Sequence, residues 1–256
     1  KVFALIGRTI INFLSIIGRL FIFTYKGVSS CFLRPYYLNI LGKQIVEIGY
    51  YSLPVVGLTT LFSGMVLALQ SYTGFARFSA EGAVATVVAL SITRELGPVL
   101  AGLMVAGRIG ASIAAEISTM RVTDQIDALE TLATDPYKYL VAPRIVASVL
   151  CLPFLVLVGD LIGIYGGYLV GIHKLGFNNT TYLTQTLMYL QPMDVISGIV
   201  KAAAFGFLIG LMGCYHGYNS KGGAQGVGTA TTNAVVSASI LILCLDYVLT
   251  ELLFIK

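Results

Sequence analysis

Long apolar stretches dominate the chain, and short polar or charged segments separate them. A helix needs about 20 largely apolar residues to cross the ~30 Å hydrocarbon core of a bilayer. Five stretches meet this requirement, and we expect them to span the membrane: 48–70, 83–107, 145–172, 194–216 and 233–255. The pattern therefore predicts an all-α membrane protein with five transmembrane helices.

The first 26 residues follow a different pattern. On a helical wheel six charged or polar residues fall within roughly 60° of each other, and the remaining positions are mostly Phe, Leu, Ile and Val. These six residues are Lys1, Arg8, Asn12, Ser15, Arg19 and Lys26. An apolar helix with one basic stripe is typical of a segment that lies in the membrane interface. We expect an amphipathic interfacial helix over residues 1–34 and a five-span domain over residues 35–256.

Composition excludes most other classes of protein. Hydrophobic residues make up 57% of the chain and charged residues 11%, whereas soluble proteins carry about 25% charged residues. The net charge of +4 is not gathered on one basic face, so nucleic-acid binding is not expected. The four cysteines and two histidines do not cluster at metal-ligand spacing, so we expect no metal site.

The distribution of cations predicts the orientation. With the N-terminus in the cytoplasm, eleven Lys and Arg residues lie in cytoplasmic segments and three in external ones. This bias agrees with the positive-inside rule. We therefore expect a cytoplasmic N-terminus and a cytoplasmic segment over residues 108–144.

Two adjacent charged residues, Arg94 and Glu95, interrupt the second predicted span. Counted from Ala83, Arg94 lies about 16 Å along the helix, near the bilayer midplane. Charges at that depth must face protein or a wet cavity, and Gly97-Pro98 should break the local helix and free carbonyl groups. The pair either forms the polar floor of a substrate cavity or belongs to an ion-pair network between helices.

A second charged pair is expected between spans four and five. Lys201 and Asp246 lie at similar depths by residue counting, and a lysine in a membrane span needs a neutralising partner. Asp160 in span three is the other possible partner, and the sequence does not choose between the two.

Small residues recur at every fourth position of spans three and four. They form grooves in which helices can approach closely, either inside one subunit or at a moving or dimeric interface. The two series are Gly159, Gly163, Gly167, Gly171 and Gly198, Ala202, Gly206, Gly210.

The cytoplasmic segment contains one short amphipathic pattern. Thr123 should cap a helix with Asp124 in its first turn. Asp124, Asp127 and Glu130 would form an acidic face opposite an apolar face of Ile126, Leu129 and Leu132. Such a helix is suited to docking on another protein; the alternative is a merely solvated loop helix.

No motif for covalent catalysis or nucleotide hydrolysis is present. The run Gly222-Gly223-Ala224-Gln225-Gly226 lacks the spacing of a phosphate-binding loop, and GxSxG and HExxH motifs are absent. We therefore do not expect an enzyme.

Several segments together resemble the MlaE-type permeases, the membrane subunits of ABC transporters that move phospholipid between the inner membrane and the periplasm or outer membrane. The resemblance extends over essentially the whole chain. It rests on Ala89-Leu90-Ser91, Arg94-Glu95-Leu96-Gly97-Pro98-Val99, Ala106-Gly107-Arg108-Ile109-Gly110, Ala115-Glu116-Ile117, Met120 to Glu130, Asp135-Pro136, Ala230-Thr231-Thr232 and Leu245 to Thr250.

The resemblance implies a permease subunit of the cell inner membrane that acts as a homodimer, with residues 108–144 as its coupling segment. A separate ABC ATPase would bind ATP, so no cofactor is expected in this chain. The implied partners also include an MCE-domain periplasmic lipid carrier, a STAS-domain protein in some complexes, and phospholipid as cargo. The alternative is an ion-coupled secondary transporter with Arg94, Glu95 and Asp160 as relay groups.

Carried over to matching positions, the resemblance also implies site residues. Phospholipid contact is expected at Leu67, Tyr72, Phe75, Phe78, Arg94 and Glu95. ATPase coupling is expected at Glu116, Arg121, Asp124, Asp127 and Glu130. The chain departs from the family at Thr229 and Asn233, where members often carry basic residues, which leaves Lys43 and Lys221 as weaker headgroup contacts.

Overall fold

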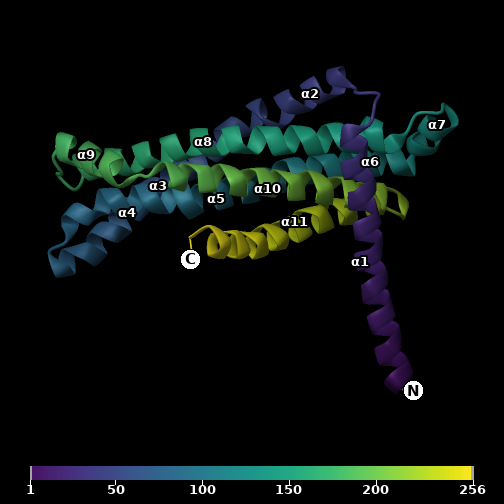
Figure 1. The fold of residues 1–256 in the computed structure, drawn as a ribbon, viewed down its shortest axis with the longest axis horizontal. Helices are drawn as coiled ribbons and strands as arrows, with labels where there is room; N and C mark the ends of the chain where they lie inside the picture. Colours follow the sequence, from purple (N-terminus) through teal and green to yellow (C-terminus); the bar gives the residue numbers. More distant parts are fainter. Residues whose placement is uncertain (1, 255–256) are drawn as a thin grey trace.

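The computed structural model describes residues 2–254. Lys1 and Lys256 lie outside this range, and the side chains of Arg8, Asn12 and Phe78 also lie outside the described part, so expectations for them stand as predictions. All regular elements of the described residues are helical (Figure 1). The α-helices are α1 (Val2–Phe32), α2 (Leu38–Ile48), α3 (Leu53–Phe75), α4 (Val84–Ser91), α5 (Gly97–Val105), α6 (Ala111–Val122), α7 (Gln125–Thr131), α8 (Ala142–His173), α9 (Asn179–Tyr189), α10 (Pro192–Tyr218) and α11 (Gly223–Phe254).

Shorter turns join some of these helices into continuous rods. Three are wide π-helical turns and three are tight 3₁₀ turns. The π turns are η4 (Ile92–Leu96), η5 (Ala106–Gly110) and η6 (Tyr137–Val141); the 3₁₀ turns are η1 (Tyr50–Ser52), η2 (Ala76–Phe78) and η3 (Glu81–Ala83).

Five helical rods are long and apolar enough to cross a membrane, which confirms the predicted all-α membrane fold. They cover Leu38–Phe75, Val84–Val122, Tyr137–His173, Pro192–Tyr218 and Gly223–Phe254. The rods of spans one, two, three and five are clearly longer than the apolar stretches from which they were predicted. In span two, a polar residue beyond the apolar stretch is bonded to a neighbouring helix: Arg108 Nη1 donates to Ser52 Oγ at 2.8 Å and to the Glu47 carbonyl at 3.2 Å.

The helical boundaries around the predicted cytoplasmic segment differ from those expected. Span two continues as α6 to Val122, and span three begins at Tyr137, so only 14 residues, 123–136, separate them. An ion pair of 2.8 Å between the buried Arg144 and the exposed Glu116 joins the two rods and lets both charges lie within helices.

Helix α8 packs against both α3 and α10, and α11 lies on the far side of α10 from α8 (Figure 1). The glycine rows make this packing possible. A Cβ on Gly163 would approach the Thr60 carbonyl and Ile92 to 3.1 Å, and a Cβ on Gly206 would overlap the Ser148 carbonyl. Both rows therefore serve close packing within this one chain.

Helix α1 leaves the bundle at a steep angle, with its N-terminal half projecting away from the other helices (Figure 1). Its C-terminal half is anchored by Phe23, which is 4% exposed and contacts the rings of Tyr137, Tyr215 and Tyr218. Phe21 and Tyr25 on the same helix are 71% and 70% exposed. The position of α1 in the membrane interface stays a prediction.

Candidate functional site

Arg94 and Glu95 lie in the wide turn η4, between α4 and α5. The N–H of Gly97 donates to the carbonyl of Ile92, five residues earlier, and this bond closes the wide turn. Pro98 at the next position lacks an N–H and would crowd the carbonyl of an ordinary α-helical turn. The break expected at Gly97-Pro98 is thus taken up as a widening of a continuous helix, a feature often found at functional sites.

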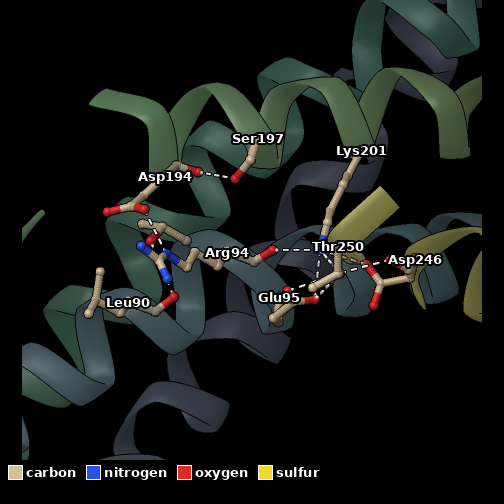
Figure 2. Close-up of polar contacts among 9 residues, drawn as sticks. Leu90, Arg94, Glu95, Asp194, Ser197, Lys201, Asp246 and Thr250 are labelled. Carbon is tan, nitrogen blue, oxygen red and sulfur yellow. Dashed lines mark hydrogen bonds and ion pairs between the residues drawn. The ribbon is translucent and has the colours of Figure 1, made fainter. Parts of the chain in front are cut away.

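Arg94 is paired with Asp194 in the first turn of α10. Arg94 Nε donates to Asp194 Oδ1 at 2.6 Å, and the guanidinium lies 4.5 Å from the centre of the Phe254 ring (Figure 2). Asp194 Oδ2 also accepts from the backbone N–H of Gln191 at 2.9 Å, so one buried carboxylate caps α10 and holds Arg94.

This pairing fixes the position of Arg94 relative to span four. Asp194 is the third residue of α10, so Arg94 lies level with the first turn of that helix. The helices of spans one and two extend beyond the start of α10, as Figure 1 shows. The depth of Arg94 near the bilayer midplane stays a prediction.

Glu95 is held by Lys201 of α10, whose side chain is completely buried. Lys201 Nζ donates to Glu95 Oε2 at 2.7 Å, to Thr250 Oγ1 at 2.7 Å and to the Arg94 carbonyl at 3.1 Å, which uses all three of its protons. It also lies 3.0 Å from Asp246 Oδ1, as an ion pair without a hydrogen bond. Asp246, not Asp160, is therefore the carboxylate beside Lys201 (Figure 2).

We call Arg94, Glu95, Asp194, Lys201, Asp246 and Thr250 the charged network. It joins spans two, four and five, and it combines two cations with three carboxylates. Asp194 and Lys201 are buried and Asp246 is partly buried, whereas the side chains of Arg94 and Glu95 are 36% and 37% exposed. The network therefore presents a polar surface whose charges are balanced from inside the protein.

Asp160 does not join this network. It is 5% exposed, and its Oδ1 has no hydrogen-bond partner among residues 2–254. A relay through Arg94, Glu95 and Asp160, as the ion-coupled alternative requires, has no hydrogen-bonded connection in the described part of the chain.

The expected apolar lipid contacts lie in the C-terminal part of span one. Leu67, Tyr72 and Phe75 are half-buried and pack against a small core that includes Val88 and Ile92. The Tyr72 ring also contacts Phe177 at 5.9 Å between centres. The α4–η4 segment therefore both packs against these side chains and carries Arg94 and Glu95 of the charged network. The side chain of Phe78 lies outside the described residues.

A short helix, α7, is present where the docking helix was predicted, but three of its expected details are wrong. Thr123 does not cap α7: it ends α6, and its hydroxyl donates back to the Thr119 carbonyl at 2.8 Å. Asp124 precedes α7 in a left-handed conformation, with φ of 56°. Ile126 is buried as expected, but Leu132 is 74% exposed and does not belong to the packed face.

The five expected coupling residues do not form one surface. Arg121 pairs with Asp127 at 2.6 Å on the exposed side of α7, and Asp124 and Glu130 are exposed nearby. Glu116 lies apart from them on α6, where it pairs with the buried Arg144. The weaker headgroup candidates, Lys43 and Lys221, are exposed, as are Thr229 and Asn233, where the chain departs from the family.

Sequence reasoning missed Asp194, Thr250 and Phe254. Asp194 follows Gln191-Pro192 at the spacing of a capping box, which indicates a helix start but not a partner for Arg94. Thr250 and Phe254 carry no signal in sequence, because their roles arise only where α11 passes beside η4.

The fold and site define a multi-pass membrane protein that holds a charged network across its spans, with no cluster of three potential metal ligands in the described residues. Comparison with known proteins agrees with this class. Residues 41–252 match the family described as Permease MlaE, and the chain therefore belongs to the MlaE permease family.

Similar proteins extend over almost the whole chain. A probable ABC transporter permease protein of Rickettsia felis is 62% identical over 97% of this chain and 96% of its own length. The intermembrane phospholipid transport system permease protein MlaE of Haemophilus influenzae is 35% identical over 97% of this chain and 96% of its own length. The chain is thus similar to proteins named as transporter permeases.

Proposed function

We propose that this chain is the permease subunit of an ABC transporter that moves phospholipids between the inner membrane and the periplasm or outer membrane. In this proposal two copies act together in the inner membrane, with their N-termini in the cytoplasm, and a separate ATPase drives them. An MCE-domain carrier would receive or deliver the lipid outside, and a STAS-domain protein is a further candidate partner.

One observation carries the proposal: the partly exposed polar pair Arg94 and Glu95 and the half-buried apolar side chains of span one are both held by the α4–η4 segment of span two. A phospholipid needs both a polar contact for its headgroup and apolar contacts for its chains. The similarity to a Haemophilus influenzae protein named for phospholipid transport supports the same substrate. Two copies would enclose such a surface more completely than one chain of five spans.

The exposed acidic side of α7 supports coupling to an ATPase. Asp127 and Glu130 project from a short helix at the end of the span-two rod, and this rod also carries Arg94 and Glu95. A movement of α7 would act on span two at one end and on the charged network further along the same rod. ATP would be bound and hydrolysed by the partner, and this chain needs no cofactor.

The test is purification of the tagged chain from its native membrane, followed by mass spectrometry of the intact complex. The proposal expects two copies of the chain, an ABC ATPase and bound phospholipid. Purification of the chain with no ATPase, under conditions in which a known ABC permease retains its own, would contradict the proposal.

A further inference from the structure

Asp160 differs from the acids of the charged network because it has no cation. Glu95 and Asp246 face Lys201, and Asp194 faces Arg94. Asp160 lies in α8 with 95% of its surface buried, since its exposure is 5%. An ionised carboxylate without a partner is costly inside a membrane span, so the side chain is held as a neutral acid.

The carboxyl group of Asp160 occupies the space that a side chain at position 97 would need, and Gly97 leaves this space free. A Cβ on Gly97 would overlap Asp160 Oδ1 and would lie 3.0 Å from its Cγ. It would also lie 2.8 Å from the Ile92 carbonyl, the acceptor that closes the wide turn η4. The planar carboxyl can approach the glycine Cα–H closely, as an oxygen acceptor does at helix–helix contacts.

Helix α8 holds η4 at both ends. Asp160 meets Gly97 just after the turn, and one turn further along α8 a Cβ on Gly163 would approach Ile92 to 3.1 Å. Helix α10 also packs closely on the turn, because a Cβ on Gly198 would lie 2.7 Å from the Thr93 carbonyl. The backbone of the wide turn is thus in close contact with two helices.

The width of this turn determines where Arg94 and Glu95 point. Each residue of an α-helix turns by about 100° around the axis, and a π turn accommodates one extra residue. If η4 tightened to an ordinary α turn, the two side chains would rotate by roughly that angle relative to the rest of span two. Arg94 would then leave Asp194, and Glu95 would leave Lys201.

We propose that Asp160 is a positioning residue: its neutral carboxyl, seated against Gly97, keeps η4 wide and so directs Arg94 and Glu95 toward Asp194 and Lys201. Asp160 acts through the turn and touches neither charged residue. Its effect on transport rests on the proposed function, whereas its effect on packing does not.

The test compares five variants in the assembled complex: Gly97→Ala, Asp160→Asn, Asp160→Leu, Asp160→Ala and the double variant Gly97→Ala/Asp160→Ala. We measure ATP-dependent phospholipid transfer and the melting temperature of each purified complex. Gly97→Ala should lower transfer at least about tenfold, as a misplaced binding group does. Asp160→Asn, which has the shape of the neutral acid, should stay within about twofold of the wild type.

The double variant and Asp160→Leu decide the outcome. Removing the carboxyl makes room for the new methyl group, so the double variant should transfer lipid at least about threefold faster than Gly97→Ala alone. Asp160→Leu keeps a similar volume but loses the planar oxygen contact, so it should fall well below Asp160→Asn. A double variant no better than Gly97→Ala, or an Asp160→Leu variant equal to the wild type, would overturn the proposal.

The two measurements separate this proposal from the proposed function. If the wild-type complex moves no phospholipid, the proposed function fails, but the melting temperatures still test the packing. In that case the double variant must melt above Gly97→Ala if Asp160 and Gly97 compete for one space, and a melting temperature at or below that of Gly97→Ala contradicts the inference.

Discussion

Lys201 donates a hydrogen bond of 3.1 Å to the main-chain carbonyl of Arg94. This carbonyl lies four residues before Pro98, which has no N–H and cannot supply the usual helical donor. A buried lysine from α10 supplies the donor instead. The proline that weakens the helix of span two therefore creates the acceptor that ties span two to span four.

Replacing Lys201 by methionine should strongly destabilise the protein. Glu95 and Asp246 would lose their buried cation, and the Arg94 carbonyl would lose its donor. Removing one partner of a buried pair costs about 3–5 kcal/mol. Unfolding of the purified protein in detergent should show this loss, whereas Lys43→Met, at an exposed lysine, should unfold like the wild type. Equal unfolding of both variants would show that the network contributes little stability.

Two substitutions should separate the two roles of Asp194, which are to pair with Arg94 and to cap α10. Asp194→Asn retains an acceptor for the Gln191 N–H but removes the charge that faces Arg94, so we expect a loss of about 1.5–3 kcal/mol. Asp194→Ala should lose about 1 kcal/mol more, because the helix cap is also removed. The measurement is the unfolding free energy of both variants. An alanine variant as stable as the asparagine variant would show that the cap has no role.

Glycines at helix crossings should tolerate no side chain. Gly206→Ala places a methyl group against the Ser148 carbonyl, so α8 and α10 must separate and the melting temperature must fall. Gly228→Ala is the matched control, because nothing lies within 4 Å of its new methyl group. Alanine there should be neutral or stabilise α11 by up to about 1 kcal/mol. Similar melting temperatures for the two variants would contradict the packing described above.

Charge reversal on α7 should separate this chain from its ATPase. Asp127→Arg combined with Glu130→Arg converts the exposed acidic side to a basic one and should abolish co-purification of the ATPase. Glu251→Arg, an equally exposed acid at the opposite end of α11, should leave co-purification intact. Full retention of the ATPase by the double variant would exclude this side of α7 as the docking surface.

The number of spans could be predicted because hydrophobic length is a local property of the sequence. The pairing of Lys201 with a carboxylate could also be predicted, since a lysine in a span needs a neutralising group. The choice of Asp246 over Asp160 could not, because it depends on how α10 is rotated between α8 and α11. Residue counting gives depth but not rotation.

The wide turn at Ile92–Leu96 is the main feature that the sequence did not reveal. Gly97-Pro98 indicated a disturbance, but a broken helix and a widened helix have the same local signal. Whether the helix breaks or widens depends on Asp160 and Gly198, which lie more than 60 residues away in the chain and pack closely against the turn. The partner of Arg94 was missed for a related reason, since Asp194 looks like an ordinary capping residue.

The central claim is that this chain moves phospholipid past the surface formed by Arg94 and Glu95. The most direct test reconstitutes the purified complex in liposomes and measures ATP-dependent transfer of a labelled phospholipid to its carrier protein. We expect transfer by the wild type and at least about tenfold less by Glu95→Leu, with ATP hydrolysis still present. A complex that hydrolyses ATP but moves no phospholipid, or a Glu95→Leu complex that moves it at the wild-type rate, would contradict the claim.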